Sequence, residues 1–235
     1  MIDVSVLMPV YNASRYPDGW IERAITSVIT QSEIDVEVCI GDDGSTDDFL
    51  HRFKDKRIKI ARNENGPTGG ADACNVAASV AKGKYFILLS CRSWYEERAL
   101  TAMSMYLDSH PDIGFVYGTS YMHRENGAFH VKNPPAYTPE QWRHSFPWSF
   151  GYMYRREAWD KGCEYGVTIE TKDGYFTIAD HDYIMQLIHV MKYEGYVMQG
   201  LTTLHYQYGG AQQNDFLAKY RTQLTHLFEE RWRGV

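Results

Sequence analysis

The chain has 235 residues, of which 44% are hydrophobic and 23% are charged, and its formal net charge is −6 at pH 7. These values are typical of a globular protein with a sizeable core, and the acidic balance disfavours nucleic acid or anionic lipid as partners held by overall charge. No apolar run reaches the roughly 20 residues that a membrane helix needs. The first residues also lack the basic flank and apolar stretch of a signal peptide. We therefore expect a cytoplasmic protein without a transmembrane segment.

The cysteines indicate a reducing compartment. Cys39, Cys74, Cys91 and Cys163 show no CxxC pairing. This spacing predicts four free thiols rather than a disulfide framework or a zinc site.

Strands and helices alternate along the first half of the chain. Apolar runs predict strands at residues 4–8, 36–40, 58–60, 85–89 and 113–117. Helical spacing of apolar residues predicts helices at 20–31, 71–81 and 96–109. Ser45 or Thr46 can cap a further helix, with Asp47 and Asp48 in its first turn. This order predicts an α/β fold, with a mainly parallel, Rossmann-like sheet that helices cover on both faces.

The periodicity weakens after Tyr117. Residues 121–150 contain glycine, proline and scattered aromatic residues, which predict a hairpin and a long loop, and such loops are often functional. A helix is predicted at about residues 180–192, a strand at 196–205 and a C-terminal helix at 215–232.

Polar side chains gather where the predicted strands end. Asn12 follows the first strand, Asp42 to Ser45 follow the second, and Ser90 to Ser93 follow the fourth. In open parallel sheets, ligands bind beyond the carboxyl ends of the strands. We therefore expect a ligand site at this edge of the sheet.

Five sequence blocks carry a family resemblance. They are VSVLMPVYN at residues 4–12, VEVCIGDDGSTD at 36–47, GADACN at 70–75 with AKGKYFILL at 81–89, GYMYRREAW at 151–159, and ADHDYIMQL at 179–187. In this order they resemble the inverting GT-A glycosyltransferases of family 2. The resemblance implies one GT-A domain over residues 1–235. Residues 1–118 would bind the nucleotide-sugar, 119–212 would form the acceptor and catalytic half, and 213–235 would form the C-terminal helix.

The resemblance implies a nucleotide-diphosphate donor, by default a UDP-sugar. Tyr11 and Asn12 can present an aromatic face and an amide to the base, after Pro9 ends the first strand. Asp42 or Asp43 can accept a hydrogen bond from the base or the ribose, because a carboxylate only accepts. A turn with a helix cap is the alternative for the segment at Asp42 and Asp43. Further candidates for the nucleotide-sugar side are Asn75, Ser90, Arg92 and Ser93. Candidates for the acceptor side are Trp94 and Arg155, although a surface charge at a helix start is the default interpretation of Arg155.

For catalysis, the resemblance implies direct displacement at the anomeric carbon of the sugar. A carboxylate takes the proton from the acceptor hydroxyl, which requires hydrogen-bond reach. Asp180 aligns with this base. Asp182 is held in reserve, because it projects differently from a helix two residues further on. The alternative for Asp180 is a carboxylate that satisfies backbone N–H groups at a helix start.

The resemblance breaks at one place. The third block of the family normally ends in Asp-x-Asp or Asp-x-Asp-Asp, which holds Mg²⁺ or Mn²⁺ against the diphosphate. The aligned residues here are Ser90, Arg92 and Ser93, so the usual metal ligands are missing. A histidine that the family often carries near its C-terminal end aligns with Tyr208.

Three explanations remain open. Arg92 can replace the metal, because a guanidinium binds two phosphate oxygens at once. The chain can be a degenerate relative that binds a nucleotide-sugar without turnover. A metal can still bind through Asp72 or through other carboxylates. We favour Arg92, because the Asn12, Asp42–Asp43 and Asp180 motifs are retained.

The expected function is transfer of a sugar, with inversion, to a saccharide or other acceptor hydroxyl. A non-catalytic nucleotide-sugar-binding protein is the alternative. A nucleotidyltransferase ranks low, because the glycine-rich basic loop near its N-terminus is absent. The sequence leaves open the donor sugar, the acceptor, the linkage and the oligomeric state.

Overall fold

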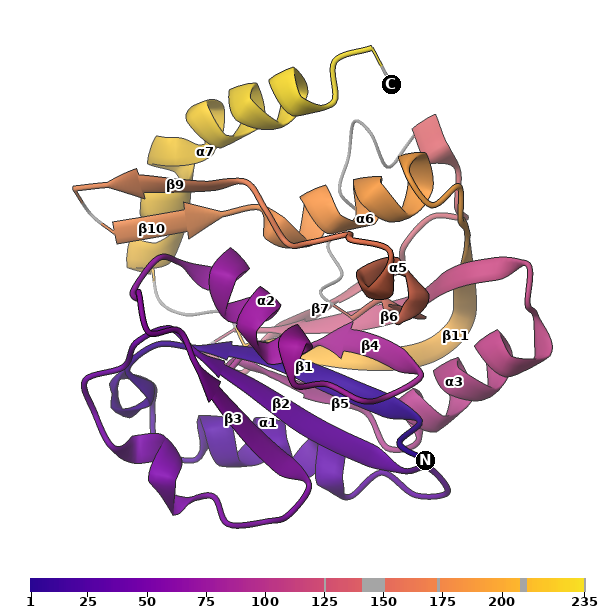
Figure 1. Ribbon diagram of the computed structural model, residues 1–235, viewed down its shortest axis with the longest axis horizontal. Coiled ribbons are helices and arrows are strands. Elements are labelled where there is room, and N and C mark those ends of the chain that lie inside the picture. The colour runs from indigo at the N-terminus through magenta and orange to yellow at the C-terminus, as the bar shows by residue number, and fades with distance from the viewer. Residues whose placement is uncertain (125, 141–150, 173, 208–210, 235) are drawn as a thin grey trace.

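The computed structural model describes residues 1–124, 126–140, 151–172, 174–207 and 211–234. Its centre is a nine-stranded sheet in the order β3-β2-β1-β4-β8-β6-β11-β5, with β7 paired to β6 (Figure 1). These strands are β1 (Val4–Val10), β2 (Val36–Asp42), β3 (Ile58–Arg62), β4 (Tyr85–Leu88), β5 (Ser93–Tyr95), β6 (Ile113–His123), β7 (Phe129–Lys132), β8 (Met153–Arg155) and β11 (Glu194–Gln207). A separate hairpin joins β9 (Thr168–Thr171) to β10 (Gly174–Thr177).

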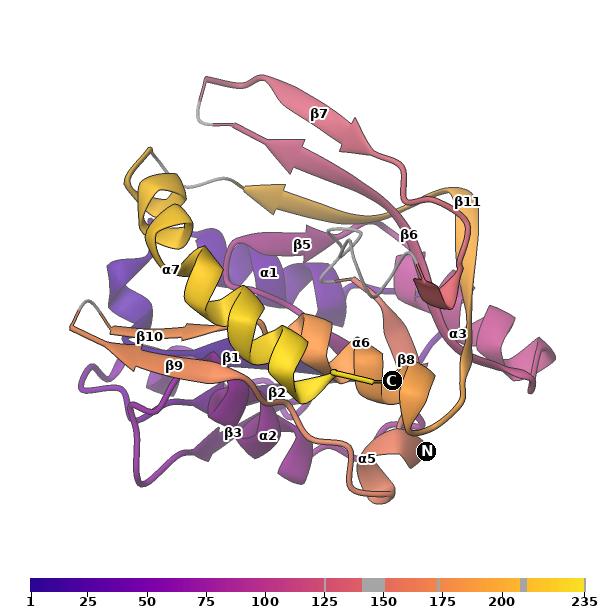
Figure 2. The same cartoon turned by 90° about the horizontal axis from the view of Figure 1, so that it is seen from above.

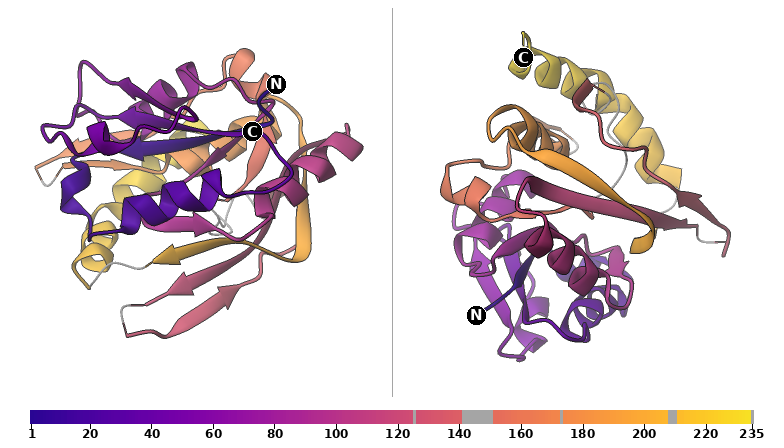
Figure 3. Two further views of the ribbon diagram at one scale, coloured as in Figure 1. Left: turned by 90° about the horizontal axis from the view of Figure 1, so that it is seen from below. Right: turned by 90° about the vertical axis from the view of Figure 1, so that its right-hand side faces the viewer.

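Helices cover both faces of the sheet. Their bounds are α1 (Trp20–Ile29), α2 (Gly70–Ser79), α3 (Ala99–Ser109), α5 (Glu157–Asp160), α6 (Ala179–His189) and α7 (Ala211–Arg231). One apolar cluster joins α1 and α3 to one face, and a second cluster joins α2, α5 and α6 to the other. Figure 3 shows α1 in front of the sheet when the molecule is seen from below. Helix α7 lies outside α6 and the β9–β10 hairpin (Figure 2). The predicted α/β class is confirmed.

The first half of the sheet is parallel. Strand β1 pairs in parallel with β2 and β4, and β2 pairs in parallel with β3. Six of the seven residues of β1 and all seven of β2 are buried, because helices cover both faces, and such strands read as continuous apolar runs. The second half is mixed, because β8 runs antiparallel between β4 and β6.

Helix α2 rests directly on the sheet. A Cβ atom at Gly41 would lie 1.8 Å from the carbonyl oxygen of Ala73, so only glycine fits there. The facing side of α2 is made of small residues, among them Ala73 and Ala77. This close contact brings the start of α2 to the carboxyl ends of β1 and β2.

The helix predicted after Ser45 or Thr46 is wrong. The chain makes only a short 3-10 turn there, Phe49–Arg52, and a second one at Ala13–Arg15. The Ser45 hydroxyl accepts the N–H of Asn12 instead of capping a helix, and Asp47 accepts hydrogen bonds from Ser14. These polar groups therefore join two loops, a contact across more than thirty residues that local sequence cannot reveal.

The later elements that were predicted agree in type and differ in their ends, whereas β8, α5, β9 and β10 were not predicted. The predicted hairpin is present as β6 and β7, and the C-terminal helix as α7. Residues 141–150 of the predicted long loop, and Tyr208, lie outside the described residues. In the described ranges, no helix combines the length and apolar character needed to cross a membrane. All four cysteines are free and buried.

Candidate nucleotide-sugar site

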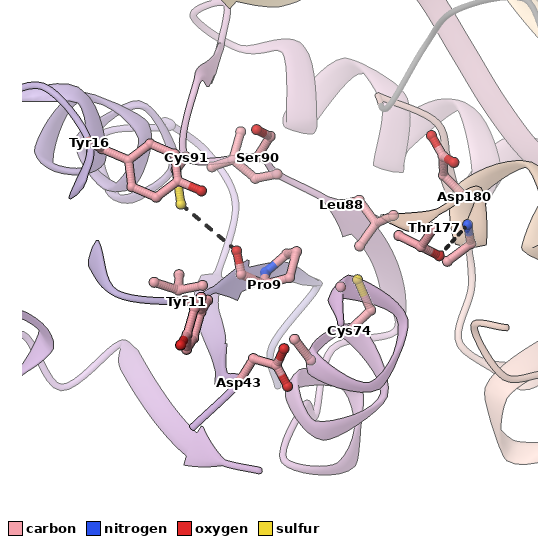
Figure 4. A pocket seen from close by; sticks show the side chains of 15 residues that line it. Pro9, Tyr11, Tyr16, Asp43, Cys74, Leu88, Ser90, Cys91, Thr177 and Asp180 are labelled. Atoms are coloured by element: carbon pink, nitrogen blue, oxygen red, sulfur yellow. Dashed lines mark hydrogen bonds between the residues drawn. The ribbon is translucent and has the colours of Figure 1, made fainter. Parts of the chain in front are cut away.

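A cavity of about 300 Å³ opens where β1 and β4 end and where α2 and α6 begin. Figure 4 shows Asp43 and Asp180 at different parts of its wall, with Cys74 between them. The wall is mainly apolar. Its residues are Pro9, Val10, Tyr11, Tyr16, Asp43, Gly70, Ala73, Cys74, Leu88, Leu89, Ser90, Cys91, Thr177, Ala179 and Asp180.

Five residues singled out from the sequence line this cavity together: Pro9, Tyr11, Asp43, Ser90 and Asp180. They come from three strand ends and one helix start, separated by up to about 170 positions in the chain. The expectation that the polar clusters meet at the carboxyl edge of the sheet is therefore met by this geometry.

The Asp43 carboxylate is held by several donors. One oxygen accepts from Asn63 Nδ2 at 2.9 Å and from the Thr68 N–H at 3.1 Å. The other accepts from the Gly69 N–H at 2.8 Å, immediately before α2. The side chain is only 4% exposed, so its position is fixed before any ligand arrives. A carboxylate has roughly four lone-pair sites, so little accepting capacity remains.

Asp180 stands in the first turn of α6. The Ala179 N–H donates to Thr177 Oγ1 at 3.0 Å, and one Asp180 oxygen accepts from the His181 N–H at 2.9 Å. The Tyr152 hydroxyl donates to the Asp180 carbonyl oxygen at 2.8 Å. Burial raises the pKa of Asp180 from its ordinary value of 3.8 to about 6, and the N–H bonds at the helix start oppose this rise. The group can therefore exchange a proton near neutral pH.

Asn12 and Asp42 lie beside the cavity rather than in its wall. Asn12 Oδ1 accepts the Thr46 N–H at 2.7 Å, and its backbone is left-handed with φ 48°, which asparagine tolerates. Asp42 accepts the Ser45 N–H at 2.8 Å and pairs with Arg62 at 2.7 Å. Both side chains shape the two loops that carry Tyr11 and Asp43.

The segment after β4 supplies hydroxyls and one cation. The Ser90 hydroxyl accepts the Arg92 N–H at 3.2 Å. Ser93 is 1% exposed, and its hydroxyl finds no partner among the described residues. Arg92 is half-buried, and its charge opposes the rise that Cys91 and burial cause in the pKa of Tyr16, which lines the cavity. Neither Arg92 nor Ser93 belongs to the cavity wall, although both follow Ser90, which lines it.

Trp94 belongs to a separate aromatic stack. Its ring lies 5.0 Å from that of His205 and 5.1 Å from that of His123, with Arg23 over it at 3.6 Å. The expectation of an acceptor-side role for Trp94 stays a prediction, since this stack is not part of the cavity wall.

Asp182, the reserve base, does not line the cavity, and its catalytic role stays a prediction. It is fully buried on the α7 side of α6, where it accepts from Trp232 Nε1 at 2.9 Å and from Gln186 Nε2 at 3.0 Å. Arg231 forms an ion pair with it at 2.7 Å. Its carboxylate oxygens are therefore occupied by partners within the protein.

Asn75 and Arg155 also lie outside the cavity wall, and their binding roles stay predictions. The Asn75 amide donates to the Tyr165 carbonyl oxygen and accepts the Tyr165 N–H, at 2.9 and 2.8 Å. The Arg155 guanidinium donates to the carbonyl oxygens of Ile113, Leu107 and His110 at 2.8–3.0 Å. In the sheet, Arg155 of β8 stands opposite Tyr85, at the end of β4 that is far from the cavity. Both side chains hold the backbone rather than a ligand.

Several cavity residues were missed from the sequence. Tyr16, Cys74 and Cys91 line the wall, and burial raises the pKa of both thiols, which keeps them neutral. Thr177 also lines it, and a threonine just before a helix start is a signal that could have been used. No sequence signal links Tyr152 to Asp180.

The side chains at the strand end do not fit the metal that the family resemblance implies. Ser90 offers a hydroxyl, and Arg92 brings a positive charge. The oxygens of Asp43 already accept hydrogen bonds, and Asp72 is exposed on the first turn of α2. Within the described parts of the chain, no three His, Cys, Asp or Glu side chains are grouped to hold a metal ion.

Curated proteins of known name are similar to this chain in sequence. A chondroitin synthase of Pasteurella multocida is 28% identical over 198 residues, which cover 81% of this chain and 19% of the relative. The Escherichia coli protein WfgD, named UDP-Glc:alpha-D-GlcNAc-diphosphoundecaprenol beta-1,3-glucosyltransferase, is 34% identical over 119 residues, covering 49% of this chain and 44% of the relative. The chain thus spans about a fifth of the length of the synthase.

Solved structures support the fold. S. aureus TarS 1–349, in a crystal structure with UDP-GlcNAc, superposes with a TM-score of 0.67 at 18% identity, over 89% of this chain and 60% of TarS 1–349. Residues 5–163 match the family described as Glycosyl transferase family 2, which is more than half of the chain. The chain therefore belongs to glycosyl transferase family 2.

Proposed function

We propose that this protein transfers one sugar from a nucleoside-diphosphate donor to an acceptor hydroxyl, with inversion at the anomeric carbon. The observation that carries the proposal is that Asp180 lines the cavity of this family 2 chain with a pKa raised to about 6. A general base is most effective when its pKa lies near the working pH. The UDP-linked substrate in the name of WfgD and the UDP-GlcNAc bound to TarS support a UDP-sugar as donor.

In this reaction the acceptor oxygen forms a bond to the anomeric carbon while the bond from that carbon to the diphosphate oxygen breaks. Asp180 takes the proton of the acceptor hydroxyl, and the nucleoside diphosphate leaves from the opposite face. Tyr11 and Asp43 line the same cavity from the strand-end loops. We assign the nucleoside to their side and the acceptor to the side of Asp180.

Arg92 is our candidate for neutralising the leaving diphosphate. It follows Ser90, which lines the cavity, and its charge acts on Tyr16 in the cavity wall. A guanidinium carries a permanent charge and can bind two phosphate oxygens. Arg92 would thus take the place that carboxylates and a dication have elsewhere in the family.

Calorimetry with UDP tests the donor site. Purified protein is titrated once with Mn²⁺ and once with excess chelator, alongside Arg92→Ala and the control Arg98→Ala, an exposed arginine paired with Glu33. We expect equal binding in both buffers and at least about tenfold weaker binding for Arg92→Ala alone, since a charged hydrogen bond contributes about 1.5–3 kcal/mol. Binding only with Mn²⁺ would contradict the role of Arg92.

Release of UDP from a panel of UDP-sugars with saccharide acceptors tests the transfer itself. We expect Asp180→Asn to lose turnover while keeping the UDP affinity of the wild type. Ligand binding without turnover for any donor would instead favour a nucleotide-sugar-binding protein.

A further inference from the structure

The C-terminal helix is fastened to the helix that carries Asp180. Asp182 is 0% exposed, and it accepts hydrogen bonds from Trp232 and Gln186 and pairs with Arg231. Trp232 and Arg231 lie about fifty residues further along the chain, at the end of α7. A buried carboxylate without its partners would be strongly unfavourable, so these contacts fix where α7 ends on α6.

Apolar and aromatic contacts reinforce the same junction. Phe228 and Trp232 pack with Met185 in one apolar cluster. The His181 ring stacks on Phe228 with 4.2 Å between the ring centres. Figure 2 shows α7 running across α6 and the β9–β10 hairpin. Helix α6 is thus held between the sheet on one side and α7 on the other.

Asp180 and Asp182 point to opposite sides of α6. Two residues turn a helix by roughly 200°, since one turn takes 3.6 residues. Asp180 lines the cavity, and Asp182 faces α7. A shift of α6 towards or away from α7 therefore moves Asp180 within the cavity.

We propose that Asp182 is a positioning residue, which clamps α7 to α6 and thereby fixes the direction in which Asp180 enters the cavity. The inference rests on the proposed function of Asp180 as the base. Asp182 itself does not touch the substrate. Arg231 supplies its counter-charge, and Trp232 orients it.

The test compares Arg231→Met, Asp182→Asn and the double variant with the wild type. Arg231→Met leaves a buried carboxylate without its cation. We expect kcat to fall about 10- to 100-fold, because small misplacements of a reacting group have effects of this size, while KM for the donor stays within about twofold. The acid limb of the pH–rate profile should move to lower pH, because a loosened Asp180 is better solvated. The double variant should recover part of the loss, because it contains neither charge.

Arg233→Met is the matched control, since Arg233 lies at the same end of α7 with a 74% exposed side chain. Its kcat and pH profile should equal those of the wild type. Unchanged kcat and acid limb in Arg231→Met would overturn the proposal. The proposal would also be overturned if Asp182→Asn lost turnover as completely as Asp180→Asn while α6 stayed protected from amide hydrogen exchange.

Amide hydrogen exchange at residues 179–183 tests the clamp, meaning the contacts of Asp182 with Arg231 and Trp232, independently of the proposed activity. Faster exchange in Arg231→Met than in Arg233→Met supports the clamp even if no donor gives turnover, in which case the proposed function alone fails. Equal exchange in the two variants overturns the clamp, whatever the activity.

Discussion

Replacing Asp180 by Asn should make the fold more stable while removing the proposed activity. The pKa of Asp180 rises from 3.8 in the unfolded chain to about 6 in the folded protein, chiefly because the carboxylate is buried. Its contribution to stability is therefore fully present below pH 3.8 and is lost as the pH rises through 6. This rise corresponds to at most about 3 kcal/mol, and to about 1–2 kcal/mol once partial solvation is discounted. Asn is neutral throughout, so the variant avoids this loss.

Urea denaturation at pH 5 and at pH 8 measures the effect. The gain in unfolding free energy of Asp180→Asn over the wild type should be larger at pH 8 than at pH 5 by about 0.5–1 kcal/mol, because about half of the loss has already occurred at pH 5. Asp72→Asn is the control, because Asp72 is exposed in the first turn of α2. A gain that is equal at both pH values, or larger at pH 5, would refute the assignment of a raised pKa to Asp180.

Two further predictions follow from the cavity and the sheet. For the wild-type protein, kcat/KM should fall about tenfold per pH unit below pH 6, because Asp180 must lose its proton to act as a base. Its neighbours Cys74 and Tyr152 have raised pKa values and stay neutral in this range. A flat pH–rate profile between pH 5 and 7 would contradict the assignment. Gly41→Ala should destabilise the fold by about 3 kcal/mol or more in urea denaturation, because its Cβ would lie 1.8 Å from the carbonyl oxygen of Ala73; a loss below about 1 kcal/mol would mean that α2 moves away from the sheet at little cost.

The strands and their polar ends were predictable because the signals are local. Apolar runs gave β1, β2 and β4, and the polar residues after them could be placed at one edge by the geometry of parallel sheets alone. This geometry places Asp43 at the edge, whereas Asp180, at a helix start, is added to the same site by the family resemblance alone. The family resemblance supplied their roles, which the structure leaves as proposals.

Asp182, Asn75 and Arg155 lie outside the cavity wall for a shared physical reason. Each has partners far away in the chain, namely Trp232, Tyr165 and Leu107. The orientation of a buried polar side chain depends on the donor or acceptor that hydrogen-bonds to it. A partner fifty or ninety residues away cannot be identified from the local sequence. The short 3-10 turn in place of the helix after Ser45 has the same origin, because Ser45 and Asp47 hydrogen-bond to the preceding loop.

The hydrogen bonds between the loops after β1 and β2 limit how either loop can be replaced. Asn12 and Ser14 in the first loop exchange hydrogen bonds with Ser45, Thr46 and Asp47 in the second, at 2.7–3.2 Å. A loop transplanted from a relative without its companion would lose these bonds and leave polar groups unmatched. The two loops should therefore be replaced together in any variant designed to change the base that the proposed site would accept.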